Sequence, residues 1–337
     1  MSQNSDIPKS RPESEVHSEL DWTHGGVKDP SKMNSATIDP PGDFPANKGL
    51  RYKLNPWTLG KLETLAKSRF LISDFVLMSD LDWSKGRDHT IEAIAQSVLA
   101  SNEIEGETVY VRDAEVQGAI QTTIEDGEAT ADWEKRRRNG QDMYDAYIFA
   151  LNSKNEELLS VEFILDLHRR MFSKVYPDTA GITKREPVVI SGRIYNIKTA
   201  SPKRTKTLFE AIIFEFNRKH QLAQDHSEFC TILLIAEFLV DFLAIHPFED
   251  GNGRMARLLS TYLLEKTGYH FARFYSLDNI IQETKSDYYQ ALYGAQKSWF
   301  KQDEDMTEWV EYYIEIVYKQ WRRAHEYLKD RKVKDDR

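Results

Sequence analysis

Apolar residues recur at helical spacing along most of the chain, which predicts a mainly helical protein. The longest such pattern runs from Pro56 to Met78, with Leu and Phe side chains spaced for one face of a helix. Pro56 suits the first turn of a helix, where its missing amide hydrogen costs no hydrogen bond. A second helix is expected from about Arg87 to Ile104, again with its apolar residues on one face. These patterns favour the all-α class.

The same spacing predicts helices along the rest of the chain and leaves one place for strands. Further helices are expected over residues 113–124, 129–151, 161–175, 202–221, 227–244, 255–264 and 306–329. The exception is the apolar run 188–190, which is followed by Ser191-Gly192-Arg193 and by a second short run, 194–197. Two short apolar runs around a glycine-containing turn indicate a β-hairpin. The predicted fold is therefore all-α with one hairpin.

Composition separates the first 50 residues from the rest of the chain. Residues 1–50 are rich in Ser, Pro, Asp, Lys and Asn and poor in large apolar side chains. Such a segment buries too little apolar surface to offset its ordering entropy. We therefore expect a disordered or loosely docked tail. The whole chain of 337 residues is 40% hydrophobic, which is enough for a sizeable core beyond that tail.

Charge and cysteine content exclude several kinds of protein. The net charge of −9 and the lack of a basic cluster argue against general nucleic-acid binding, which needs positive surface. Cys230 is the only cysteine, so the sequence excludes a disulfide framework and a cysteine-based metal site. The first residues lack the apolar core of a signal peptide, and no apolar run approaches the roughly 18 residues that span a membrane. We expect a cytoplasmic protein without membrane association.

The most informative stretch is a loop predicted between two helices. It has the sequence His-Pro-Phe-Glu-Asp-Gly-Asn-Gly-Arg-Met-Ala-Arg over residues 246–257. Gly251 and Gly253 flank Asn252, and glycine adopts backbone angles that are closed to other residues. A turn of this kind at the start of a helix directs amide hydrogens toward one point, where the positive end of the helix dipole adds to them. The stretch therefore suits an anion such as phosphate.

Charged side chains complete a candidate polyphosphate site in this loop. Arg254 and Arg257 lie three residues apart on the first turn of the following helix and so share a face. Asp250 offers the hard oxygen ligand that Mg²⁺ prefers beside substrate phosphates. His246 is placed to accept a proton from an incoming hydroxyl group. Phe248 is expected to anchor the loop in the core.

The loop resembles the signature of the Fic (Fido) family, His-x-Phe-x-Asp/Glu-Gly-Asn-Gly-Arg-x-x-Arg, at every specified position. Members of that family typically transfer AMP from ATP to a Ser, Thr or Tyr hydroxyl of a protein. The resemblance implies that His246 is the general base and that Asp250 is the Mg²⁺ ligand. The residues that it assigns to the phosphates are Gly251, Asn252, Gly253, Arg254 and Arg257. ATP and Mg²⁺ are the cofactors implied, and pyrophosphate is the leaving group.

A second motif, Ser-Asn-Glu-Ile-Glu-Gly, ends the second predicted helix. Ser101 and Glu105 are four residues apart and share a helix face, and Gly106 suits the left-handed conformation that closes a helix. In a Fic-like chain this motif resembles the inhibitory helix, Ser/Thr-x-x-x-Glu-Gly/Asn, of relatives that carry their own inhibitor. The resemblance implies that Glu105 pairs with Arg257 in the space that the γ-phosphate needs.

This second resemblance implies an autoinhibited enzyme, because a carboxylate on the phosphate-binding arginine competes with ATP. An alternative role for Glu105 stays open beside inhibition. Glu105 also resembles the motif glutamate of a few relatives in which that residue aligns a water molecule to remove AMP from a modified protein. De-AMPylation is therefore a second activity to consider.

Two further regions take their roles from the resemblance alone. The predicted hairpin corresponds to the flap beside the Fic loop, which holds a target segment by adding a strand to it. The docking residues implied are Val188, Val189 and Ile190. The pair Tyr288 and Tyr289 resembles the adenosine pocket of the family, and Gln296 stands where the family usually has Asn.

The expected organisation is a tail (1–50), an N-terminal helical region with the inhibitory helix (51–127), the Fic catalytic core (128–300) and a C-terminal helix (301–337). The expected partners are ATP and a target protein whose hydroxyl docks on the flap, with a homodimer left open. Two alternatives also stay open. One is a Fic-fold transferase with another nucleotide or phosphate-containing donor. The other is a nucleotide-sensing adaptor, against which the intact His246 and Asp250 argue, because binding alone needs neither.

Overall fold

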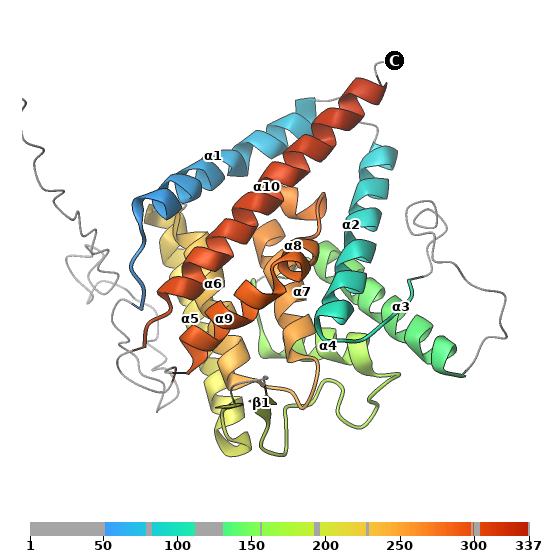
Figure 1. Cartoon of the computed structure of the whole chain (residues 1–337), viewed down its shortest axis with the longest axis vertical. Helices are drawn as coiled ribbons and strands as arrows, with labels where there is room; N and C mark the ends of the chain where they lie inside the picture. Colours follow the sequence, from blue (N-terminus) through green and yellow to red (C-terminus); the bar gives the residue numbers. More distant parts are fainter. Residues whose placement is uncertain are drawn as a thin grey trace, which may run out of the picture.

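A computed structural model describes residues 51–78, 83–111, 131–155, 157–191, 196–226, 229–297, 299 and 304–335. In these residues the chain forms ten α-helices, one short 3-10 helix and a two-stranded sheet (Figure 1). The all-α class with one hairpin is therefore confirmed. The tail expected over residues 1–50 and the helix expected over residues 113–124 lie outside the described residues.

Along the described part of the chain, four α-helices precede the hairpin, which lies between α4 and α5, and six follow it. The helices are α1 (Pro56–Met78), α2 (Trp83–Ile104), α3 (Ala131–Asn152), α4 (Val161–Phe172), α5 (Pro202–His226), α6 (Phe229–Ile245), α7 (Asn252–Lys266), α8 (Leu277–Glu283), α9 (Lys285–Gln296) and α10 (Thr307–Asp335), with the 3-10 helix η4 (His270–Arg273). The strands β1 (Val189–Ser191) and β2 (Asn196–Lys198) pair antiparallel, with Ile190 opposite Ile197.

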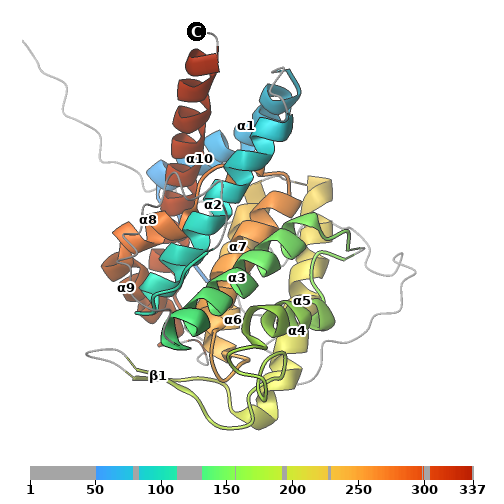
Figure 2. The ribbon, with the colours of Figure 1, turned by 90° about the vertical axis from the view of Figure 1, so that its right-hand side faces the viewer.

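Helix α7 lies at the centre of the described structure. Helices α2, α3, α6 and α8 all pack against it, and Figure 2 shows it framed by α2, α3 and α6. Helix α6 has only two charged residues, Glu237 and Asp241, and Leu239, Val240 and Phe242 are buried in it. A helix that is apolar over most of its surface is stable only inside a protein. The loop that joins α6 to α7 therefore starts and ends on buried helices, and this fixes its position.

The segment before α1 is fastened to the core by a buried arginine. The Arg51 guanidinium donates to both carboxylate oxygens of Asp241 in α6, at 2.7 and 3.0 Å, and to Glu304 at 2.5 Å. Trp299 Nε1 donates to the same Asp241 carboxylate at 2.6 Å. These contacts join the start of the described chain to its middle and to the segment that precedes α10.

Several helix boundaries differ from the sequence prediction. Helix α2 begins earlier than expected, at Trp83, and α5 and α10 continue beyond the predicted ends to His226 and Asp335. The added turns are mostly polar, so apolar spacing does not mark them. Helix α4 ends at Phe172, before the predicted residue 175, and a turn follows in which the Phe172 carbonyl accepts the Val175 and Tyr176 amides at 3.0 and 2.7 Å. Helix α7 begins at Asn252, inside the predicted loop.

The hairpin and two short helices also depart from the prediction. Ser191, expected in the turn, is the last residue of β1, and Val188 precedes that strand. Thr199 closes the base of the hairpin, because its hydroxyl donates to the Val188 carbonyl at 2.7 Å. Helices η4 and α8 were not predicted, since a few turns of mixed polar and apolar residues carry no clear period.

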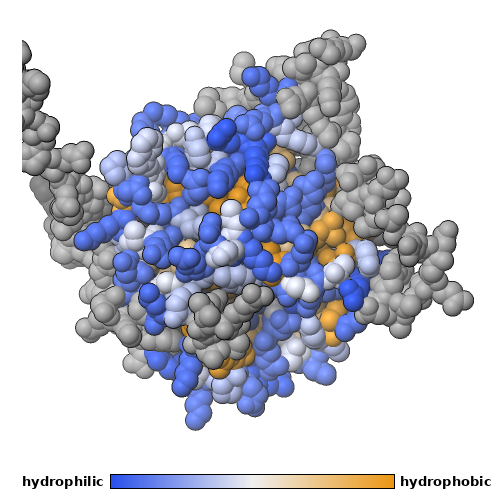
Figure 3. Space-filling model, viewed as in Figure 1, coloured by the Kyte–Doolittle hydropathy of each residue, from blue (hydrophilic) through white to orange (hydrophobic). Residues whose placement is uncertain are grey.

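The apolar residues lie mainly inside, as the composition requires. On the face shown in Figure 3, hydrophilic side chains predominate and hydrophobic ones form small patches between them. In the part of the chain that the structure describes, no helix combines the length and apolarity that crossing a membrane takes.

Candidate active site

The loop between α6 and α7 is closed by its own polar groups. Asn252 is buried, its side-chain oxygen accepts the Phe248 amide at 3.0 Å, and its side-chain nitrogen donates to the Phe248 carbonyl at 2.9 Å. Gly251 precedes α7 with a φ of 79°, a left-handed conformation that favours glycine. The Asn252 side chain is thus used to brace the loop, and only its backbone is left to face a phosphate.

Phe248 anchors the loop, as the sequence predicts. Its ring is fully buried and stacks on the His168 ring with centroids 3.7 Å apart. Phe209 and Phe242 pack around it from α5 and α6. The turn that carries the charged residues therefore rests on a rigid aromatic base.

His168 holds the loop in place in addition to packing, a role that the sequence did not reveal. Its Nδ1 accepts the Gly181 amide at 2.8 Å, which leaves the proton on Nε2, and Nε2 donates to the Asp250 carbonyl at 3.0 Å. Burial lowers the pKa of His168 to about 4, so the ring is neutral at pH 7. Only the neutral ring makes both contacts.

His246 follows the last residue of α6 with a φ of 56°, unusual for a residue other than glycine. Its Nδ1 lies 3.1 Å from the Leu243 carbonyl, which only accepts, so Nδ1 carries the proton and Nε2 keeps its lone pair. Burial, together with the nearby charge of Lys184, lowers the pKa of His246 to about 4, although the Leu243 contact, Glu105 and Asp250 oppose this shift. At pH 7 the ring is a neutral proton acceptor.

Asp250 has an open carboxylate in this loop. Its side chain is 54% exposed, with Oδ1 accepting the Gly251 amide at 2.7 Å and Oδ2 accepting Arg254 Nη2 at 3.0 Å. One exposed carboxylate beside a phosphate site is the donor set that Mg²⁺ uses with nucleotides. The residues present therefore fit the metal that the sequence implies.

Arg254 is buried, with its guanidinium over the Phe172 ring at 4.7 Å. Besides Asp250, its partners are Glu107, whose Oε2 accepts Nη1 at 2.7 Å, and Asn102, whose side-chain oxygen accepts Nη1 at 3.3 Å. Glu107 lies only two residues after Glu105, but no pattern in the sequence singled it out. Both arginines that were expected to hold phosphates therefore face carboxylates from the segment that ends α2.

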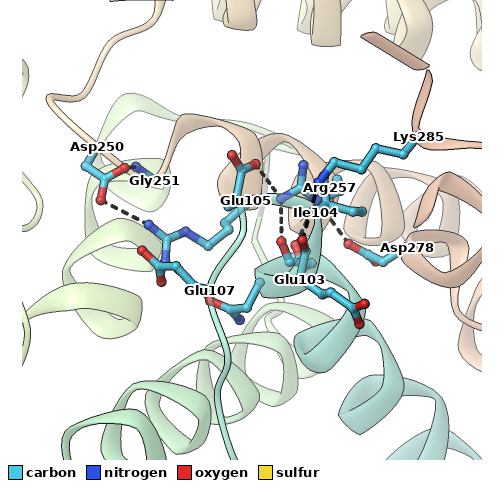
Figure 4. A network of polar contacts seen from close by, with 12 residues as sticks. Glu103, Ile104, Glu105, Glu107, Asp250, Gly251, Arg257, Asp278 and Lys285 are labelled. Atoms are coloured by element: carbon cyan, nitrogen blue, oxygen red, sulfur yellow. Dashed lines mark hydrogen bonds and ion pairs between the residues drawn. The ribbon is translucent and has the colours of Figure 1, made fainter. Parts of the chain in front are cut away.

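Arg257 lies at the centre of a second polar network (Figure 4). Its Nη2 donates to Glu105 Oε1 at 2.7 Å and to the Ser101 carbonyl at 2.9 Å, and its Nε donates to the Ser101 hydroxyl at 2.8 Å. The fully buried carboxylate of Asp278 lies 3.3 Å from Nε. Asp278 belongs to the unpredicted helix α8, and no sequence signal singled it out.

Glu105 lies directly over the start of α7. A Cβ atom added to Gly253 would come 2.2 Å from Glu105 Oε1, so the carboxylate fills the space above this glycine. Gly106 has a φ of 81° and ends the helix, which turns the following residues toward Arg254. The expected pairing of Glu105 with Arg257 is thus present in the structure.

A pocket opens beside these groups and is lined mainly by apolar side chains. Its lining residues are Glu105, Ile190, Leu243, His246, Gly253, Tyr288, Tyr289, Leu292, Tyr293 and Gln296. The Tyr289 hydroxyl donates to the Ile104 carbonyl at 3.3 Å, and burial raises the pKa of Tyr288 to about 12. Gln296 is buried, and within the described residues its side-chain nitrogen has no hydrogen-bond partner. The pocket therefore contains an unused donor.

The hairpin contributes to the same pocket. Ile190 of β1 lines it, whereas the neighbouring Val189 points outward and is 48% exposed. Successive side chains of a strand point to opposite faces. The three residues expected to dock a target thus differ in position: Val188 lies at the base of the hairpin, Val189 on its surface and Ile190 in the pocket.

Comparisons with known proteins agree with this geometry. The sequence profile of the Fic/DOC family matches residues 158–264. Protein adenylyltransferase fic-1 of Caenorhabditis elegans is 29% identical over 196 residues, which are 57% of this chain and 34% of the relative. Protein adenylyltransferase Fic of Aedes aegypti is 28% identical over 178 residues, which are 53% of this chain and 33% of the relative. The chain thus spans about a third of the length of these curated relatives.

A solved structure shares the fold. A Fic domain containing signaling protein from Bacteroides thetaiotaomicron superposes with a TM-score of 0.60 at 21% identity, and the match covers 81% of this chain and 97% of that chain. The helical arrangement around α6 and α7 is therefore common to both proteins.

Proposed function

We propose, from the premise that the chain carries a Fic/DOC family domain over residues 158–264, that it is a protein adenylyltransferase. It transfers AMP from ATP, bound with Mg²⁺, to a Ser, Thr or Tyr hydroxyl of a target protein. The observation that carries the proposal is the state of His246. Its Nε2 is unprotonated at pH 7, and the ring lines the same pocket as Gly253 and the α9 tyrosines.

In the proposed reaction the target oxygen attacks the α-phosphorus of ATP. The hydroxyl proton passes to His246 Nε2, a new oxygen–phosphorus bond forms, and the bond from the α-phosphorus to the bridging oxygen breaks. Pyrophosphate leaves with that oxygen. The amides at the start of α7, together with Arg254 and Arg257, hold the negative charge of the leaving group.

Asp250 supplies the protein ligand for Mg²⁺ in this proposal. Mg²⁺ bound with ATP neutralises phosphate charge, which is its usual contribution in nucleotide chemistry. The Arg254 contact with Asp250 fixes the direction of that carboxylate. The His168 contact holds the backbone of the same residue.

Autoinhibition by Glu105 is the second part of the proposal. The carboxylate lies over Gly253 and holds Arg257, so it occupies the position that a terminal phosphate needs. ATP must displace Glu105, or it binds with its α-phosphate turned away from in-line attack. In either case the enzyme loses the positioning on which phosphoryl-type transfer depends.

Target docking on the hairpin is the third part. The edge of a two-stranded sheet offers free backbone groups to an extended segment, and Val189 is exposed on its surface. Because Ile190 lines the pocket next to His246, a strand added to β1 brings its side chains close to the base.

Mass spectrometry of AMP addition tests the transferase and its inhibition together. Wild type, Glu105→Gly, Glu105→Gly/His246→Ala and the matched control Glu103→Gly are incubated with Mg·ATP, alone and with lysate. We expect a mass gain of one AMP for Glu105→Gly alone. Glu103 is exposed on the same segment, so its replacement leaves inhibition intact. A Glu105→Gly protein that binds ATP and modifies nothing would contradict the proposal.

De-AMPylation by the same site is a second candidate activity, and the position of Glu105 favours it. Its carboxylate lines the pocket beside His246, where it can align a water molecule for attack on an AMP-modified side chain. Purified modified protein should then release AMP with wild type and not with Glu105→Gly. Release that is independent of Glu105 would exclude this role.

The nucleotide donor is tested separately, because arginines and backbone amides hold phosphates without reading a base. The unpaired nitrogen of Gln296 is the group in the pocket that is free to select one. Labelled ATP, GTP, UTP and CTP are compared with Glu105→Gly as the enzyme. Transfer from ATP alone supports the adenylyltransferase, and a preference for another donor supports the alternative transferase.

A further inference from the structure

Lys184 is a buried lysine between the hairpin and the loop that carries His246. The residue is only 3% exposed, and burial lowers the pKa of its amine to about 8. Among the ion pairs of the described residues, none includes Lys184. A charged amine in such a position needs polar partners, because burying it without hydrogen bonds costs far more than burying a neutral polar group in the same way.

The partners of Lys184 belong to two different parts of the site. Its Nζ donates to the carbonyl of Ile245 at 2.8 Å and to the hydroxyl of Thr199 at 2.7 Å. Its backbone amide donates to the Pro247 carbonyl at 2.8 Å. Lys184 therefore holds the residue before His246 and the residue after it.

The hydrogen-bond chain continues from Thr199 into the hairpin. The Thr199 hydroxyl, which accepts from Lys184, donates to the Val188 carbonyl at 2.7 Å. Val188 directly precedes β1 and Thr199 directly follows β2, so this contact closes the base of the hairpin. One continuous chain thus runs from the Ile245 carbonyl through Lys184 and Thr199 to Val188.

The end of α6 explains why a cation belongs at this place. The last carbonyl groups of a helix have no partner within the helix and carry the negative end of its dipole. The Phe242 carbonyl is taken by the His246 amide at 2.8 Å, and the Leu243 carbonyl is taken by the His246 ring. Lys184 serves the Ile245 carbonyl, so the group that ends the helix also fixes the start of the active loop.

We propose that Lys184 is a positioning residue that sets the hairpin relative to His246, and so sets where a docked target hydroxyl meets the base. This inference rests on the proposed function, because it assumes that the target binds on the hairpin. The residues proposed to hold phosphates, Arg254 and Arg257, have their own hydrogen-bond partners, and in the described residues none of these is Lys184. Its loss should therefore change transfer to the target and leave nucleotide binding intact.

The variants are made in the Glu105→Gly background, where transfer is expected to be measurable. Lys184→Met removes the charge and keeps the aliphatic length, Lys184→Arg keeps the charge, and Lys203→Met is the control at an exposed lysine near the start of α5. We expect Lys184→Met to lower kcat for the target by about ten- to a hundredfold, because small misplacements of reacting groups have costs of this size. Lys184→Arg should recover part of the rate, and Lys203→Met should match the parent.

Two further readouts separate positioning from general damage to the fold. The affinity for Mg·ATP should stay within about twofold of the parent, since the phosphate groups are not touched. The charge of Lys184 lowers the pKa of His246, so its removal should raise that pKa. The acid limb of the kcat profile should therefore move to higher pH. The other titratable groups that face this ring are Glu105, absent from this background, Asp250 and the α9 tyrosines.

A second variant covers the case in which Lys184→Met fails to fold. Thr199→Val has nearly the same volume and breaks the chain at the hairpin without touching the loop. It should lower kcat for the target in the same direction and leave Mg·ATP affinity unchanged. Full transfer by both variants, or a loss of ATP binding in parallel with the rate, would overturn the inference.

Failure of the proposed function is distinguishable from failure of this inference. A Glu105→Gly parent that transfers no AMP contradicts the function. The link, by which we mean the hydrogen-bond chain from Lys184 through Thr199 to the hairpin, can still be measured by amide hydrogen exchange. Lys184→Met should reduce protection in β1 and β2, and Lys203→Met should not. Unchanged protection in both variants would overturn the link itself.

Discussion

His246 owes its chemical state to the place where it sits at the end of α6. The helix ends at Ile245, and the ring turns back so that Nδ1 donates to the Leu243 carbonyl. That contact fixes the tautomer, and burial favours the neutral form. The ring is therefore a base over the whole neutral pH range, which an ordinary histidine with a pKa of about 6.5 is not.

The lowered pKa of His246 predicts a pH dependence for the transfer reaction. The base form is present above the folded pKa, so kcat of Glu105→Gly should be nearly constant from pH 8 to pH 6 and fall only as the pH approaches about 4. Initial rates at saturating Mg·ATP in buffers of constant ionic strength measure this. A half-maximal rate near pH 6.5 would mean that the ring titrates like an exposed histidine.

His168 shows how a residue without a chemical role can decide the geometry of a site. It is buried against Phe248. Its two ring nitrogens also connect the Gly181 amide to the Asp250 carbonyl. No local sequence signal marks this role, because the two partners of the ring come from separate turns of the chain.

At the scale of elements, the end of α2 brings two carboxylates to two arginines. Glu105 holds Arg257, and Glu107 holds Arg254, with Gly106 making the turn between them. Glu105 is 32% and Glu107 is 38% exposed, whereas both arginines are almost fully buried. The segment thus covers at once the two arginines that we propose as phosphate ligands, and the second contact was not expected from the sequence.

This arrangement predicts that Glu107 also competes with the nucleotide. In the Glu105→Gly background, Glu107→Gln should lower KM for Mg·ATP by about three- to tenfold, because it removes a partly exposed negative charge from Arg254 and keeps the side-chain size. In wild type the same change should have little effect, since Glu105 still covers Arg257. Steady-state kinetics measure the effect in the Glu105→Gly background, and Mg·ATP binding measures it in wild type, with Glu103→Gln as the control. An unchanged or higher KM would show that Glu107 does not compete.

Helix α8 makes a contribution that only its packing reveals. It places the buried carboxylate of Asp278 beside Arg257, on the side away from Glu105 (Figure 4). Burial raises the pKa of Asp278, and Arg257 opposes that shift. Arg257 therefore has a carboxylate beside it that is independent of Glu105, and this contact fixes the position of the guanidinium.

At the scale of the whole molecule, the site depends on contacts between distant parts of the chain. Arg51 reaches Asp241 across 190 positions and Glu304 across 253 positions. Asp241 lies on α6, a few residues before the loop. The segment before α1 and the segment before α10 are thus held against the helix that ends in the active loop.

The buried Arg51 network predicts a large loss of stability when its cation is removed. Arg51→Met leaves two carboxylates facing each other in a buried place, and the free energy of unfolding should fall by about 3–5 kcal/mol. Arg322→Met is the control, because Arg322 pairs with Glu326 in an exposed place and should change the stability by less than about 1 kcal/mol. Denaturant unfolding followed by circular dichroism measures both. Equal effects of the two changes would mean that the Arg51 network adds nothing.

The sequence determined the features that rest on local spacing and on residue type. Helical periodicity gave α1 its correct bounds, and the glycines around Asn252 marked the turn before α7. The charged residues of the loop indicated the chemistry, and Phe248 was correctly expected in the core. These features could be predicted because a helix or a turn is specified by residues that are neighbours in the chain.

The tertiary structure decided which side chains meet. The pairs of Arg254 with Glu107, of Arg257 with Asp278 and of Lys184 with Ile245 join different elements, and for the first of these the separation is 147 positions. Such contacts follow from the angles and distances at which whole helices pack, and these depend on the complete core. Periodicity describes one element at a time, so it could indicate a phosphate site but could not show that carboxylates from α2 occupy it.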